Sequence, residues 1–212
     1  EALNHPSLDP EISAAIKQLI EQLKKDGHIA DPVKFDLLDY IVPAYYVLTT
    51  AEASSNLSRY DGVRYGYRTP LVNSDLTEFY KQTRSEGFGK EVKRRIMLGT
   101  FVLSAGYYDA YFTRAQKVRR LLSDKTREIF NSFDFILLPT SPVTAFKTGE
   151  KMNDPVAMYL ADIYTVMANL VGIPAISLPL FKHSNNMPFG LQVMANRFDE
   201  LTLLQVSGLM MN

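Results

Sequence analysis

Two adjacent arginines precede a long apolar run in the segment EVKRRIMLGTFVLSAGYYDAY, residues 91–111. If this segment is helical, one stripe of the helix consists of Val92, Ile96, Gly99 and Leu103. Arg95 lies at the edge of that stripe, whereas Arg94 points about 100° further away. Gly99, one turn on, is expected to leave room over the Arg95 guanidinium. Of the two arginines, Arg95 is therefore the one predicted to be partly buried.

A partly buried guanidinium needs a carboxylate, because leaving it unpaired costs about 3–5 kcal/mol. The carboxylate can come from a ligand or from an internal Asp or Glu, and the side chain can also lie at the surface with only its stem covered. Asp162 lies in the apolar stretch MYLADIY. A carboxylate among apolar neighbours needs a cationic partner, so Asp162 is a second candidate for an ionic contact.

Motifs for catalysis are absent from this sequence. It has no Cys, so disulfides, thiolate metal sites and a cysteine nucleophile are excluded. The three histidines are far apart, which argues against a histidine metal site. There is no P-loop, GxGxxG or GxSxG pattern, and no SxxK pair. The sequence therefore offers no convincing catalytic nucleophile with its base.

Composition limits the classes of partner. The 212 residues contain 23 Lys and Arg and 23 Asp and Glu, so the formal net charge is zero. A surface built mainly for nucleic acid or anionic lipid is therefore not indicated. No apolar stretch reaches the roughly 18–20 residues of a membrane helix, so no membrane contact is expected. The missing cysteines are typical of a reducing compartment, and a cytoplasmic location is predicted.

Helical and strand patterns alternate without a regular repeat. Helices are predicted at 8–27, 36–60, 74–85, 90–104, 107–132, 154–172 and 199–211. Asp9, Ser74 and Asp154 are the expected caps of three of them, with Pro10 at the first position of the first helix and Gly172 at the end of the sixth. Strands are predicted at 28–35, 133–142, 173–180 and 189–195. This pattern predicts an α/β fold with a mixed β-sheet covered by helices. So few strands in a chain of this length indicate that part of the fold is missing.

Two stretches have an open interpretation. The basic run TRAQKVRR, residues 113–120, is either a solvated helix face or a contact for RNA or a partner. SRYDGVRYGYR, residues 58–68, alternates arginine with tyrosine, which occurs in nucleic-acid binders. It is equally consistent with the packing of a loop kinked at its glycines.

Several segments together resemble the amidase signature family. They are VPAYYVLTTAEASSNLSRYDGVRYGYR, SEGFGKEVKRRIMLGTFVLSAGYYDAYFTRAQKVRRL, DPVAMYLADIYT and GIPAISLPL with PFGLQVMANRFDELTLL. Within the family, the EASSNLSRYDGVRYGYR and EGFGKEVKRRI blocks are most similar to the A subunits of glutamyl-tRNA(Gln) amidotransferases. The similarity extends from about residue 9 to residue 204 and is to the C-terminal half of those subunits. It implies that residues 1–212 are the C-terminal part of a single amidase domain.

The resemblance implies roles for three residues. In these A subunits an arginine and an aspartate bind the amino-acid end of glutamine, and the matching positions are Arg95 and Asp162. A tyrosine of the PAYY block lies beside the substrate, and Tyr46 is the best match. The serine nucleophile, the second serine and the lysine base of the family lie in segments that match nothing in this sequence. The resemblance therefore implies a substrate-binding part that is inactive alone.

The implied reaction belongs to a larger assembly. The A subunit hydrolyses glutamine, and the ammonia converts Glu-tRNA(Gln) to Gln-tRNA(Gln) for protein synthesis. The implied partners are the B and C subunits, with ATP and Mg²⁺ on the B subunit and no cofactor on this chain. Two alternatives stay open: a part of a free-standing amidase, and a non-catalytic module that binds tRNA or a partner.

Overall fold

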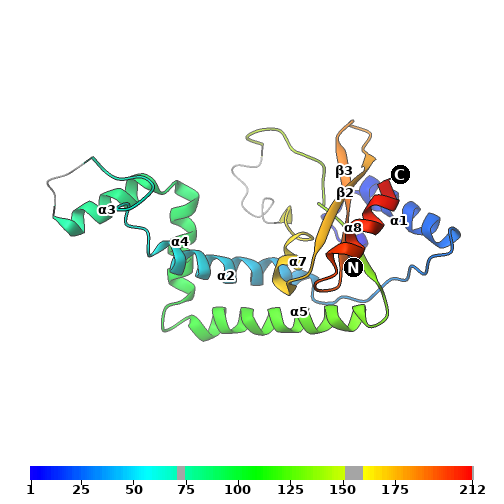
Figure 1. Cartoon of the computed structure of the whole chain (residues 1–212), viewed down its shortest axis with the longest axis horizontal. Coiled ribbons are helices and arrows are strands. Elements are labelled where there is room, and N and C mark those ends of the chain that lie inside the picture. The colour runs from blue at the N-terminus through cyan, green and yellow to red at the C-terminus, as the bar shows by residue number, and fades with distance from the viewer. Residues whose placement is uncertain (71–74, 151–159, 212) are drawn as a thin grey trace. The chain divides into compact units, whose positions relative to one another are not determined.

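The computed structural model describes residues 1–70, 75–150 and 160–211 (Figure 1). The chain forms two compact units, one of residues 1–43 with 118–212 and one of residues 44–117. We call them the sheet unit and the helical unit. The assignment of residues 1–212 to one amidase domain stays a prediction. None of the helices in the described segments has the length and apolar character needed to span a membrane.

The sheet unit is built around three strands. β1 (Phe135–Pro139) and β2 (Ala175–Lys182) each pair in antiparallel fashion with the central strand β3 (Pro188–Ala195). Residues 191–195 of β3 are all buried, which requires cover on both faces of the sheet. The predicted α/β class is confirmed. Both pairings are antiparallel, so the described strands do not contain the parallel pairing that a mixed sheet also needs.

Helices cover this sheet. The short 3₁₀ helix η1 (Ala2–Asn4) and helix α1 (Pro10–Lys25) contact β1. Helix α8 (Glu200–Met211) contacts β2 and β3 (Figure 1). α1 begins where its sequence predicts, because the Asp9 carboxylate accepts a hydrogen bond of 2.8 Å from the Glu11 backbone N–H. Its apolar face buries Ile12 and Ile16.

The helix predicted at 154–172 is interrupted within its described part. Its first part, including the cap at Asp154, lies outside the described residues. Residues 161–165 form a turn, and α7 (Val166–Val171) follows and ends at Gly172, which has a φ of 74°. In the turn, the buried Tyr164 donates a hydrogen bond of 3.0 Å to the Ala2 carbonyl. Tertiary packing here prevails over the helical period of the sequence.

The strand predicted at 28–35 is wrong. These residues are extended but pair with no strand in the described structure. The Phe35 backbone N–H instead donates a hydrogen bond of 2.9 Å to the Glu1 carboxylate. A strand needs a neighbouring ladder as well as an apolar pattern, and the pattern alone does not supply one.

The helical unit contains most of α2 (Leu38–Leu57), all of α3 (Leu76–Gly87) and α4 (Lys90–Val102), and the start of α5. The helix predicted from residue 107 is confirmed, but it begins as a π-helix, η2 (Tyr108–Thr113), before α5 (Arg114–Phe130). Pro43 lies inside α2, where it removes one helical hydrogen bond without ending the helix. Ser74, the predicted cap of α3, lies outside the described residues, and Asp75 occupies the cap position.

Candidate functional site: an arginine between two helices

Helix α4 approaches α2 closely at Gly99. Gly99 is buried, and a Cβ built on it would overlap the Thr50 carbonyl oxygen and lie 2.6 Å from Cβ of Ser54. One residue on, Thr100 Oγ1 and Ser54 Oγ form a hydrogen bond of 3.0 Å. Gly99 thus serves the contact between the two helices. The expectation that it leaves room over Arg95 stays a prediction.

Arg95 lies one turn before that contact, on the side of α4 next to α2. Its side chain is 37% exposed, compared with 63% for Arg94. The order of burial predicted for the two arginines is therefore confirmed, although Arg95 is half-buried rather than enclosed. The internal bridge left open by the sequence also exists, because Arg95 pairs with Glu91.

Glu91 binds both arginines through different oxygens. Its Oε1 accepts a hydrogen bond of 3.0 Å from Nε of Arg95, and its Oε2 accepts one of 3.0 Å from Nη1 of Arg94. Sequence reasoning missed Glu91 as a site residue, although its positions three and four residues before the arginines are a signal for such pairs. In the described part of the chain, the two terminal nitrogens of Arg95 have no hydrogen-bond partner. Glu91 therefore fixes the guanidinium by its edge and leaves the terminal fork open.

Tyr46 supplies the surface against which Arg95 lies. The carbon at the centre of the Arg95 guanidinium is 5.7 Å from the centre of the Tyr46 ring. Tyr45 packs edge-on to the same ring at 5.4 Å, and the Tyr46 carbonyl accepts a hydrogen bond of 2.6 Å from Oγ1 of Thr50. A cation over a tyrosine ring is attracted by the ring quadrupole. The structure thus brings together two of the three predicted substrate-binding residues, Arg95 and Tyr46.

Asp162, the third predicted residue, belongs to the sheet unit. It is half-buried in the turn that precedes α7, beside the buried Ile163 and Tyr164. Its backbone carbonyl accepts a hydrogen bond of 3.2 Å from the Val166 N–H. Its place beside Arg95 stays a prediction.

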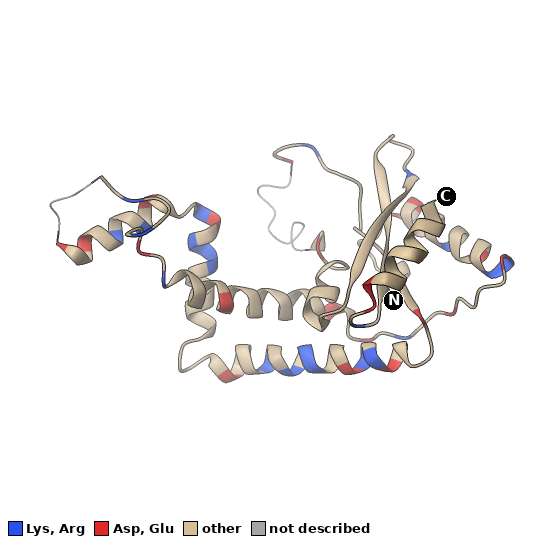
Figure 2. Ribbon diagram, in the orientation of Figure 1, with Lys and Arg blue, Asp and Glu red and all other residues tan. Residues whose placement is uncertain are grey.

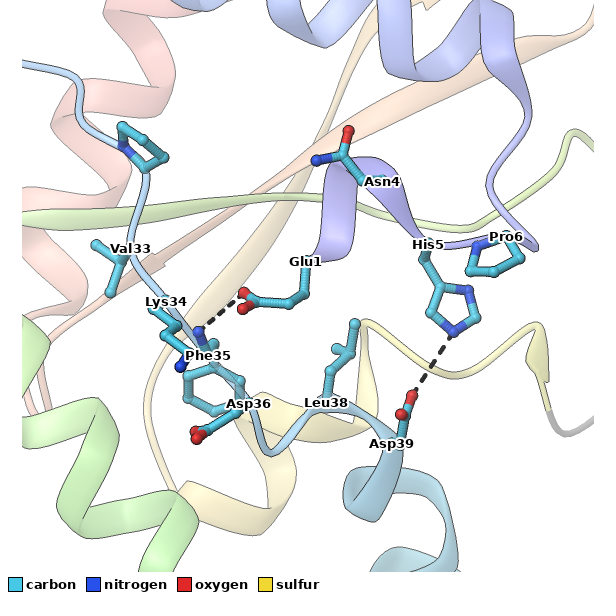
Figure 3. Close-up of a pocket in the computed structure, with 11 residues that line it drawn as sticks. Glu1, Asn4, His5, Pro6, Val33, Lys34, Phe35, Asp36, Leu38 and Asp39 are labelled. Atoms are coloured by element: carbon cyan, nitrogen blue, oxygen red, sulfur yellow. Dashed lines mark hydrogen bonds and ion pairs between the residues drawn. The ribbon is translucent and has the colours of Figure 1, made fainter.

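The sheet unit has a separate cavity of about 720 Å³ that sequence reasoning did not predict (Figure 3). η1 and the extended segment before α2 form its walls. The Glu1 carboxylate and the Phe35 N–H meet at one side, and Nε2 of His5 lies 3.8 Å from the Asp39 carboxylate at the other (Figure 3). Both contacts join one wall of the cavity to the other, so we assign these four residues a structural role. In the described segments no group of three or more His, Asp or Glu side chains could hold a metal ion.

Comparison with known proteins agrees with the resemblance seen in the sequence. The A subunit of glutamyl-tRNA(Gln) amidotransferase from Chlorobium phaeobacteroides is 51% identical over 97% of this chain, and that from Acidobacterium capsulatum is 53% identical over 94%. These alignments cover 43% and 42% of the two relatives. The chain therefore spans less than half the length of the curated relatives it matches.

Solved structures share the fold. The crystal structure of the glutamyl-tRNA(Gln) amidotransferase A subunit from Thermotoga maritima superposes with a TM-score of 0.67 and 43% identity, over 93% of this chain and 38% of that one. A 6-aminohexanoate cyclic dimer hydrolase superposes with a TM-score of 0.71 at 20% identity, over 99% of this chain and 42% of that one, which supports the fold alone. The amidase family model matches residues 1–204, nearly the whole chain. This chain therefore belongs to the amidase family.

Proposed function

We propose that this chain is the part of a glutamine-hydrolysing subunit that binds the amino-acid end of glutamine. The whole protein is then the A subunit of a glutamyl-tRNA(Gln) amidotransferase, a carbon–nitrogen ligase that uses glutamine as its amide donor. The names of the relatives at 51% and 53% identity support this proposal. Within the chain, the open fork of Arg95 supports it.

The Arg95 fork carries the proposal because its geometry suits a carboxylate. A guanidinium binds a carboxylate best through two parallel N–H bonds. Glu91 occupies Nε of Arg95, so the two terminal nitrogens stay available for a second carboxylate. Tyr46 shields one side of the guanidinium, which lowers its exposure to water. An amino-acid ligand would place its α-carboxylate at this fork.

The other residues follow from the chemistry of glutamine. The Asp162 carboxylate would accept hydrogen bonds from the α-ammonium group, and the Tyr46 ring would lie beside the bound molecule. The nucleophilic serine and its base would come from parts of the amidase domain that this sequence does not contain. Attack on the side-chain amide would form an acyl-enzyme and release ammonia. The B subunit, with ATP and Mg²⁺, would use that ammonia on Glu-tRNA(Gln), and a C subunit would join the assembly.

Calorimetric titration of this chain with glutamine and two truncated analogues tests the proposal. Glutaramate lacks the α-amino group, and 4-aminobutanamide lacks the α-carboxylate. Arg95→Ala should weaken glutamine binding by about 10- to 100-fold, because a charge-assisted bidentate contact is lost. The same variant should bind 4-aminobutanamide as tightly as the parent chain does, because this ligand has no α-carboxylate. Asp162→Asn should show the opposite pattern, with glutaramate as the insensitive ligand.

Arg94→Ala is the matched control, because Arg94 also pairs with Glu91 but is the more exposed of the two arginines. It should bind glutamine as the parent chain does. Equal losses for Arg94→Ala and Arg95→Ala, or equal losses for glutamine and 4-aminobutanamide, would contradict the assignment. Ammonia release from glutamine by this chain alone would contradict the expectation that it has no nucleophile.

A further inference from the structure

The two units differ in charge although the whole chain is neutral. The helical unit, residues 44–117, contains 11 Lys and Arg against 7 Asp and Glu, a net charge of +4. The sheet unit contains 12 basic against 16 acidic residues, a net charge of −4. The balanced total therefore conceals a basic unit. Such an asymmetry is typical of chains in which one part contacts an anionic partner.

Much of this positive charge lies in one loop between α2 and α3, residues 59–68, which we call the arginine–tyrosine loop. Its three arginines, Arg59, Arg64 and Arg68, are exposed, and none forms an ion pair in the described structure. Tyr65 is 74% exposed. Its ring meets Tyr60 obliquely, with the ring centres 6.3 Å apart, so most of the ring is open to solvent.

The loop is held in shape by its own interior. The Tyr60 hydroxyl donates a hydrogen bond of 2.6 Å to the Tyr67 carbonyl. Arg84 of α3 donates hydrogen bonds of 2.7 and 2.9 Å to the carbonyls of Leu57 and Tyr60. Gly66 has a φ of 80° and packs against the Tyr60 ring, where a Cβ would not fit. The exposed arginines and Tyr65 are therefore presented by a pre-formed loop, which lowers the entropy lost on binding.

The carboxylates nearest to the loop in sequence and structure are already engaged. Asp61 accepts a hydrogen bond of 2.9 Å from the Val63 N–H. Glu86 accepts one of 2.6 Å from the Tyr67 hydroxyl, and this bond holds the pKa of Glu86 below its ordinary value. Neither carboxylate forms an ion pair with the loop arginines.

Helix α5, the other basic stretch, is organised differently. Its two acidic residues, Asp124 and Glu128, lie among the basic residues of its second half, and Figure 2 shows both charges on this helix. Arg120 and Arg127 both pair with Asp124, each at 3.0 Å. Its charges are thus partly neutralised on the helix itself, which is the pattern of a solvated face.

We propose that the arginine–tyrosine loop binds single-stranded nucleic acid, with Arg59, Arg64 and Arg68 at the phosphates and the open face of Tyr65 under a base. Arginine at phosphates together with an exposed aromatic ring is the chemistry that recognises unpaired nucleotides. An acidic protein would use the arginines but would have no requirement for a flat ring. The choice of RNA over DNA rests on the proposed function, in which a tRNA takes part.

Fluorescence anisotropy with labelled 12-nucleotide oligouridylate and oligodeoxythymidylate, from 50 to 300 mM NaCl, tests this proposal on the full chain. The affinity of the parent chain should fall with salt. The plot of log K against log salt has a negative slope. Arg64→Ala should make that slope shallower by about 0.7, the value for one phosphate contact on a single strand. Tyr65→Ala should weaken binding by roughly 5- to 100-fold, while Tyr65→Phe keeps the ring and the affinity.

Arg120→Ala, on α5, is the control with the same change of charge and should leave the affinity and the salt slope unchanged. Parent-like binding by both Arg64→Ala and Tyr65→Ala would overturn the proposal. Weaker oligonucleotide binding by Arg64→Ala but not by Tyr65→Ala, together with competition by polyglutamate as strong as that by the oligonucleotides, would also overturn it. That result would indicate an acidic protein partner. Tighter binding of oligouridylate than of oligodeoxythymidylate would support RNA as the nucleic acid that the loop binds. The glutamine titration of Arg64→Ala should be unchanged, which keeps failure here distinct from failure of the glutamine assignment.

Discussion

Replacing Gly99 by alanine tests the contact between α2 and α4 on which the arginine site depends. The added Cβ would overlap the Thr50 carbonyl oxygen, and it would lie 2.6 Å from Cβ of Ser54. Ordinary carbon contacts are about 3.5–4.0 Å apart. A backbone carbonyl inside a helix has little freedom to move, so the two helices must separate to admit the methyl group.

The expected cost follows from three contributions. Overpacking of a tight contact costs about 1–3 kcal/mol. Separation of the helices also stretches the hydrogen bond between Ser54 and Thr100, which contributes about 1 kcal/mol. Alanine is the better helix former by about 1 kcal/mol, which offsets part of the loss. We expect Gly99→Ala to lower the free energy of unfolding by about 1–3 kcal/mol.

Urea unfolding followed by circular dichroism measures this loss, and Gly208→Ala is the matched control. Gly208 lies inside α8 and is exposed, and a Cβ built on it meets nothing within 4 Å. That variant should be stabilised by up to about 1 kcal/mol, since only the helix preference changes. If Gly99→Ala were as stable as Gly208→Ala, the close approach of α2 and α4 would be refuted. Glutamine binding by Gly99→Ala should also weaken, because Arg95 moves away from Tyr46.

Two further predictions concern the sheet unit. Asp9→Ala removes the side-chain cap of α1 and should lower the free energy of unfolding by about 0.5–2 kcal/mol, measured by urea unfolding, while Asp9→Asn keeps the cap and most of the stability. Burial raises the pKa of Tyr164 from 10.0 to about 12. The folded protein therefore holds this proton more tightly than the unfolded chain, so its contribution to stability is complete below about pH 10 and is lost as the pH rises toward about 12. The urea unfolding midpoint of the parent should fall between about pH 9 and pH 11, and that of Tyr164→Phe should fall less. An equal fall in both proteins would exclude Tyr164 as the origin of the pH dependence.

Local signals in the sequence were sufficient where one element determines its own structure. Asp9 and Pro10 predict the start of α1, and Gly172 predicts the end of α7, because caps depend on a few adjacent residues. The apolar runs at β1, β2 and β3 predict strands, but their periodicity contains no information on which strand pairs with which. The extended segment 28–35 shows the same limit, since its pattern resembles a strand and its surroundings provide no ladder.

The arginine site was also predictable only in part. The helical period alone places Arg95 nearer the neighbouring helix than Arg94, and the exposed fractions of 37% and 63% agree. The role of Tyr46 could not be derived from spacing, because Tyr46 and Arg95 meet only through the packing of α2 on α4. Resemblance to a family supplied that residue where the physics of one segment could not.

Glu91 explains why a charged fork can persist beside the close contact between α2 and α4 before any ligand binds. An unpaired guanidinium at a half-buried position would be costly, and one bond from Nε to Glu91 lowers that cost while it fixes the plane of the group. Had Glu91 occupied both terminal nitrogens, a ligand carboxylate would need to displace it. Because it holds the edge instead, a ligand adds two hydrogen bonds without breaking one. Glu91→Gln should therefore preserve the orientation of Arg95 better than Glu91→Ala, and its glutamine affinity, measured by the same titration, should lie between those of Glu91→Ala and the parent.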